Sequence, residues 1–124
     1  MAEFGTPVDQ GPRLNFTDVD GYLIVALPSV ISDHTLATYC QQISRIVERS
    51  RQRGVIINLA AVNLLDYGAL NQIRRICRSN TLLGSTTVLL GARPSIAAYL
   101  AELPDGMEDL IFCGDMDSAK LACG

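Results

Sequence analysis

The sequence has very little lysine, histidine and tryptophan, and each scarcity argues against a class of function. Lys120 is the only lysine, His34 is the only histidine, and tryptophan is absent from the 124 residues. With a formal net charge of −3, a surface so poor in lysine is not typical of a general nucleic-acid binder. A lone histidine without paired carboxylates nearby disfavours acid–base and nucleophilic catalysis. We therefore expect a protein that is not an enzyme and does not bind nucleic acid.

Long apolar runs, paired cysteines and familiar catalytic motifs are also missing. No run approaches the roughly 18 apolar residues of a membrane helix, and the first 13 residues contain no stretch typical of a secretory signal. The sequence holds no Walker loop, Gly-x-Ser-x-Gly or HExxH motif. Its four cysteines form no CxxC pair, which argues against a zinc site. These observations predict a cytoplasmic protein without a metal, cofactor or membrane partner.

The composition that remains is that of one globular domain. Hydrophobic residues make up 48% and charged residues 19% of the chain, enough for a single core. Residues 1–13 show no periodicity and are predicted to form a flexible tail, in which Glu3-Phe4-Gly5-Thr6 resembles a vector-derived remnant. Residues 14–124 are predicted to form the domain.

The first half of the domain predicts a hairpin, a helix and a central strand. Leu14–Thr17 and Tyr22–Ala26 flank a turn that ends in glycine, which favours an antiparallel hairpin. Ser32 or Asp33 then caps a helix that continues to about Arg53 and is ended by Gly54. Its apolar positions, which include Cys40, recur every three or four residues. The apolar run Val55–Leu59 is typical of a central strand covered on both faces.

The second half alternates helices and strands. A helix over Tyr67–Ser79, with Cys77 on its buried face, precedes a strand over Thr86–Leu90. Pro94 begins a third helix, Leu110–Phe112 forms a last strand, and Asp115 or Asp117 caps a short final helix. This order predicts an α/β fold with a mixed sheet, an N-terminal hairpin and crossover helices. The residues expected to be nearly fully buried are Ile57, Leu70, Ile73, Val88, Leu90 and Ile96.

A candidate site lies where the parallel strands end. In open α/β sheets ligands bind beyond the carboxyl ends of the strands, which here means Asn58–Gly68 and Gly91–Ser95. Asp66-Tyr67-Gly68 stands where the second helix begins, and a helix N-terminus favours an anion such as a covalently attached phosphate. The simpler interpretation is that Asp66 serves only as an N-cap.

The basic residues are almost all arginine and fall in two segments, Arg45–Arg53 and Arg74–Arg78. Arginine suits partner recognition because its planar guanidinium group can form two parallel hydrogen bonds with a carboxylate. A solvated helix face is the alternative interpretation. If Arg74 and Arg78 contact a partner, reversing their charge should weaken association with little change in stability, because exposed charges contribute little to folding.

Three segments together resemble a STAS domain, the family that includes bacterial anti-sigma factor antagonists. They are Gly54–Leu59, Asn63–Asp66 and Leu82–Ala97, and the similarity runs from Leu14 to Cys123. Within the third segment, the Leu-Leu-Gly and Gly-x-Arg-Pro-x-Ile-Ala blocks resemble the stressosome antagonists of the RsbS and RsbR type. The resemblance implies signalling in a bacterial stress response, by binding a serine/threonine kinase or anti-sigma factor of the GHKL type. It also implies assembly with other STAS proteins, as a homo- or hetero-oligomer.

The sequence departs from the family pattern at its switch positions. The family usually has Asp-Ser or Asp-Thr at the start of the second helix, where this chain has Asp66-Tyr67. Tyr99 stands where one branch carries a second threonine, and Asn58 replaces the usual strand-end aspartate. Because a phenol oxygen projects well beyond a serine hydroxyl, we expect no phosphorylation of Tyr67 by a serine/threonine kinase. The residues predicted to bind the partner are Asn58, Asn63, Leu64, Leu65, Gly68, Arg74 and Arg78.

Two other classes of function stay open. One is a ligand-sensing STAS module that holds a small anion or nucleotide in a pocket at Asn58, Asp66, Gly91 and Arg93. A buried Tyr67 ring would close that pocket, whereas an outward ring would present a partner surface. The other is a pure assembly subunit in which Arg74, Arg75 and Arg78 contact neighbouring copies.

Overall fold

The fold is built on a five-stranded mixed sheet with the strand order β3-β4-β5-β6-β7. The computed structural model describes residues 14–103 and 109–124, so the predicted tail over residues 1–13 lies outside the described residues. The hairpin is confirmed: β3 (Asn15–Val19) pairs antiparallel with β4 (Tyr22–Ala26). A two-residue turn joins them, with positive φ at Asp20 (54°) and Gly21 (83°), the conformation that suits a tight hairpin.

The other three strands run parallel to β4. β5 (Gly54–Asn58) pairs with β4 and with β6 (Thr87–Leu90), and β6 pairs with the two-residue β7 (Phe112–Cys113). The prediction that the apolar run after Arg53 forms a central strand is confirmed, since β5 is the middle strand of the sheet. Its first four residues are buried because helices cover both faces at this point.

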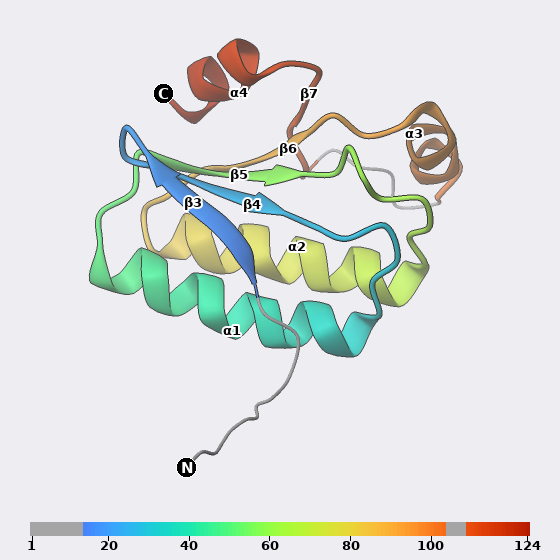
Figure 1. Ribbon diagram of the computed structural model, residues 1–124, viewed down its shortest axis with the longest axis horizontal. Helices are drawn as coiled ribbons and strands as arrows, with labels where there is room; N and C mark the ends of the chain where they lie inside the picture. Colours follow the sequence, from blue (N-terminus) through green and yellow to red (C-terminus); the bar gives the residue numbers. More distant parts are fainter. Residues whose placement is uncertain (1–13, 104–108) are drawn as a thin grey trace.

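Helices lie on both faces of the sheet and at one edge (Figure 1). α1 (Asp33–Arg49) and α2 (Tyr67–Leu82) pack side by side on one face, and α4 (Met116–Cys123) covers the other. α3 (Pro94–Ala101) stands beyond the carboxyl ends of the parallel strands, and it begins at Pro94 as predicted. None of the helices in the described ranges is long and apolar enough to cross a membrane.

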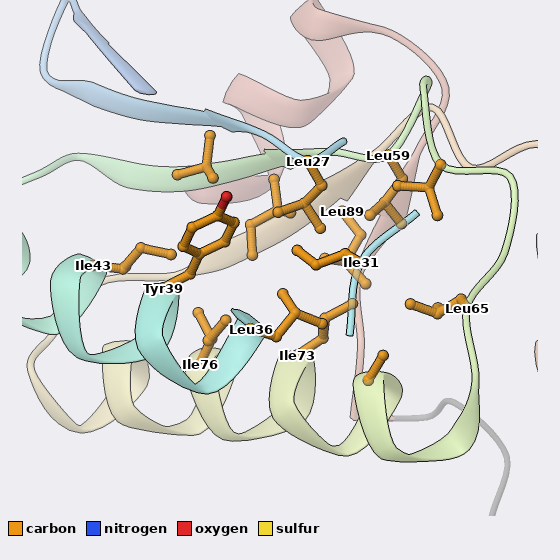
Figure 2. Close-up of a cluster of buried hydrophobic side chains, with 14 of the residues drawn as sticks. Leu27, Ile31, Leu36, Tyr39, Ile43, Leu59, Leu65, Ile73, Ile76 and Leu89 are labelled. Atoms are coloured by element: carbon orange, nitrogen blue, oxygen red, sulfur yellow. The ribbon is translucent and has the colours of Figure 1, made fainter. Parts of the chain in front are cut away.

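The main core lies between the sheet and the α1–α2 layer (Figure 2). Leu36, Tyr39, Ile43 and Val47 form the buried stripe of α1, with the predicted spacing. A smaller cluster under α4 includes Ile56 and Val88. All the residues predicted for the core are buried, with exposed fractions between 0% and 7%: Ile57, Leu70, Ile73, Val88, Leu90 and Ile96.

Several element boundaries differ from the predictions. β3 spans Asn15–Val19 and not Leu14–Thr17, and β6 begins at Thr87 and not Thr86. α1 ends at Arg49, because Ser50 is already extended (φ −128°, ψ 129°), and Gly54 begins β5 instead of ending the helix. A Cβ atom at Gly54 would collide with the Sγ atom of Cys123 in α4, so this glycine permits close packing of α4 on the sheet. α2 continues to Leu82, three residues past the predicted end at Ser79. The last strand is shifted to Phe112–Cys113.

Candidate functional site

The start of α2 is held in place by its own cap and by the loop before it. Asp66 is the N-cap, and its Oδ1 accepts a hydrogen bond of 2.7 Å from the backbone N–H of Ala69. The preceding loop is tied to the segment after β4: the Asn63 N–H donates to the Ser29 carbonyl at 2.8 Å, and Val30 forms a parallel bridge with Leu64. These bonds fix where the loop presents its side chains.

Four large apolar side chains around this helix start are exposed to solvent. The exposed fractions are 65% for Val30, 64% for Leu64, 47% for Tyr67 and 36% for Tyr99. Together with Asp66 they form what we call the α2-start surface. An anchored cluster of exposed apolar groups is more typical of an interaction site than isolated surface residues are.

A shallow hollow joins this surface to α3. It has a volume of about 380 Å³. Its lining residues are Asn63, Leu64, Leu65, Asp66, Ser95, Ile96 and Tyr99. Tyr67 does not line it, and with 47% of its surface exposed the Tyr67 side chain lies outward. By the criterion set from the sequence, this favours a partner surface over a closed ligand pocket.

The residues predicted for a small-anion pocket are divided between two places. Asp66 lines the hollow, while Asn58, Gly91 and Arg93 gather around Ala60. The Oδ1 of Asn58 accepts from the Ala60 N–H at 2.9 Å, and the Nε of Arg93 donates to the Ala60 carbonyl at 2.9 Å. Gly91 adopts a φ of 72°, and a Cβ there would lie 3.6 Å from the Cβ of Ala60. Asn58, Gly91 and Arg93 therefore hold the loop at Ala60 in place.

Two further residues predicted to bind a partner have structural roles. Leu65 is 4% exposed and belongs to the core. Gly68 lies against the start of α1, where an added Cβ would stand 3.0 Å from the Oδ2 of Asp33. Asn63 and Leu64 are exposed on the loop, so they are the members of this predicted group that are available to another protein.

The two arginines predicted to contact a partner differ sharply in exposure. Arg74 is 8% exposed, and its Nε lies 3.7 Å from the Oδ1 of Asp109. The side chain of Arg78 is 76% exposed, with a terminal nitrogen 4.0 Å from Oδ2 of the same aspartate. The expectation that both lie on an exposed face is wrong for Arg74, because it follows Leu70 by one helical turn and shares its buried face.

Burial disfavours the thiolate form of Cys40 in α1 and Cys77 in α2. Burial raises the pKa of the Cys77 thiol from 9.0 to about 12, with a smaller contribution from the Asp109 carboxylate. Burial also raises the pKa of Cys40, although the nearby Arg75 guanidinium opposes the shift. In the part of the chain that the structure describes, no three or more His, Cys, Asp or Glu side chains are grouped to hold a metal ion.

Sequence reasoning missed Val30 as part of the surface and Asn80 as part of the core. Val30 lies in the connection after β4 and reaches the site only through its bridge to Leu64. Asn80 is fully buried, and its Nδ2 donates to the Oγ1 of Thr87 at 2.8 Å. Both depend on contacts between distant segments, so no local pattern could have revealed them.

The fold and the site can now be set beside known proteins. The sequence model of the STAS domain matches residues 13–110. The chain belongs to the STAS family. A search of curated protein sequences found no match to this STAS domain.

Several solved structures share the fold of this STAS domain. A serine-to-glutamate variant of RsbS from Moorella thermoacetica is 20% identical, with a TM-score of 0.76 over 90% of this chain and 95% of that one. A chain from the stressosome, described as a signal integration and transduction hub, is 20% identical, with a TM-score of 0.74 over 88% of this chain and 95% of that one. The unphosphorylated anti-sigma factor antagonist SpoIIAA of Bacillus is 12% identical, with a TM-score of 0.65 over 89% and 96% of the two chains.

Proposed function

We propose that this STAS domain is a non-enzymatic protein-binding module that acts as an anti-sigma factor antagonist or stressosome component. Its partner is a kinase or anti-sigma factor of the GHKL type, which binds at the α2-start surface. The observation that carries the proposal is the cluster of exposed apolar side chains on a loop held by hydrogen bonds. A few buried anchor side chains near the centre of an interface, tyrosine prominent among them, supply most of the binding free energy.

The relatives support a signalling role for this domain. RsbS and the stressosome chain share the fold over most of both chains, and SpoIIAA has been solved in phosphorylated and unphosphorylated forms. Membership of the same family as these antagonists is the reason for preferring a protein partner over a small ligand. The apolar lining of the hollow and the carboxylate of Asp66 point the same way, because neither favours an anion.

We propose further that the phosphate switch of the family is absent here. Tyr67 stands at the first position of α2, next to the Asp66 cap, where a serine hydroxyl would lie close to the free N–H groups of the helix. The phenol oxygen of Tyr67 extends past those groups, and the side chain lies outward. The domain then keeps the binding role without regulation by a serine/threonine kinase.

Incubation with the cognate kinase and ATP, followed by intact mass measurement, tests the missing switch. Wild type should gain no phosphate, while Tyr67→Ser should gain one at residue 67, beside Asp66 and the helix N-terminus. A phosphate mapped to Tyr67 of wild type would contradict the proposal. If neither protein is modified, the kinase is removed from the proposed partners and the anti-sigma factor remains.

Capture from a native lysate identifies the partner. Wild-type bait should retain a GHKL-type protein, and the sizing of the complex should show how many STAS copies it contains. Retention of proteins unrelated to that class would contradict the partner assignment.

A further inference from the structure

A second exposed apolar surface lies at the opposite end of α2. Leu82, the last residue of the helix, is 88% exposed, and Leu83, its C-cap, is 42% exposed. Arg78 precedes Leu82 by four residues and therefore lies beside it on the same helix face. Leu83 and Arg51 line a common hollow of about 490 Å³ between the ends of α1 and α2. We call Arg51, Arg78, Leu82 and Leu83 the α2-end surface.

The two ends of the α1–α2 layer carry opposite charges. Asp33 and Asp66 are exposed where the two helices begin. His34 and Arg93 are also exposed on that side, and the Nε of Arg93 donates to the Ala60 carbonyl. Exposed arginines lie in the second halves of both helices and at Arg51, two residues beyond α1. These arginines are Arg45, Arg49, Arg51, Arg75 and Arg78. The exposed carboxylates near them are those of Glu48 and Asp109. The α2-end surface therefore complements the α2-start surface in charge, and its protruding leucines complement the apolar hollow.

We propose that the α2-end surface of one copy docks on the α2-start surface of a second copy. Leu82 and Leu83 enter the hollow between Leu64 and Tyr99, and Arg78 and Arg51 approach the carboxylates of Asp66 and Asp33. α2 has 16 residues, so its two ends are about 24 Å apart. Each copy then offers one surface to each neighbour, and the contact is head-to-tail, giving a ring or a filament.

This contact also occupies the surface that the proposed function gives to the kinase or anti-sigma factor. A copy inside the assembly is therefore closed to that partner, and in a filament only the copy at the end with a free α2-start surface can bind it. The inference shares that surface with the proposed function, but it needs no partner and is tested without one.

Sedimentation velocity on the full chain, over a range of concentrations, tests the assembly. Wild type should associate, and higher salt should weaken the association because the charged pairs are screened. Leu82→Asp and Leu64→Asp should each weaken it at least about tenfold, since each removes a buried leucine and places a carboxylate in the contact. Both leucines are exposed in the single copy, so the substitutions should leave the thermal unfolding midpoint unchanged. Leu121→Asp, at an 82% exposed leucine on α4, is the matched control and should associate like wild type.

Mixing the two variants separates a head-to-tail contact from a symmetric one. Leu82→Asp keeps an intact α2-start surface and Leu64→Asp keeps an intact α2-end surface, so the mixture should form one-to-one dimers and nothing larger. A wild-type chain that stays monomeric at every concentration would overturn the proposal. So would a Leu64→Asp chain that associates like wild type, or a mixture that stays monomeric. None of these outcomes would contradict the proposed binding of the kinase or anti-sigma factor, which is tested separately.

Discussion

At the scale of single residues, Arg74 and Arg78 show how four positions along one helix separate a core group from a surface group. Arg74 is 8% exposed beside Asp109, whereas the side chain of Arg78 is 76% exposed. Arg74→Glu would bury a carboxylate against another carboxylate and should lower the free energy of unfolding by about 3 kcal/mol or more. Arg78→Glu should change it by no more than about 0.5 kcal/mol. Urea unfolding of the two variants measures the difference, and equal effects would place both side chains at the surface.

Cys77 gives a second prediction at this scale. Its thiol has a pKa of about 12 in the fold, against an ordinary value of 9.0. Because the folded value is the higher one, ionisation favours the unfolded chain, and this contribution to stability is lost as the pH rises from about 9 towards 12. Near pH 8 the native thiol should react with iodoacetamide far more slowly than the same thiol in denaturant. Mass spectrometry of the peptides measures both rates, and similar rates would contradict the burial.

At the scale of secondary-structure elements, the Asp66 cap fixes where α2 begins. Asp66→Ala removes the acceptor for the Ala69 N–H and should lower the free energy of unfolding by about 1 kcal/mol. Asp66→Asn retains an oxygen in the same place and should lose much less. Denaturant titrations of the pair isolate the cap, and an equal loss in both variants would show that the charge of Asp66, not its hydrogen bond, supports the helix.

The elements also show what local sequence can and cannot predict. Periodic apolar positions predicted the existence of α1 and α2 and the buried face of each helix, and an unbroken apolar run predicted β5. Their ends were less predictable, because Gly54, which suggested a helix stop, is required by the packing of Cys123 from α4. The cap at Ser32 was predictable because its side chain accepts from the Thr35 N–H within the same turn.

At the scale of the whole molecule, the sheet and its covering helices follow from the order of the elements. That order put the carboxyl ends of the parallel strands at one edge, and this prediction located Leu64 and Asp66 there. Tyr99 was singled out only by the family resemblance. Two contacts could not be predicted from the sequence. One is the bridge between Val30 and Leu64, and the other is the pair of hydrogen bonds that Ala60 makes with Asn58 and Arg93. Each joins segments whose meeting depends on the finished fold.

The central claim is that the α2-start surface binds a signalling protein, and one affinity measurement tests it most directly. The protein captured by wild type is purified, and its dissociation constant is measured with wild type, Leu64→Asp and Leu121→Asp. Leu64→Asp should weaken binding at least about tenfold, because a charge replaces an apolar anchor at the centre of the contact. Leu121→Asp changes an equally exposed leucine on α4 and should bind like wild type. Equal affinities for wild type and Leu64→Asp would contradict the claim.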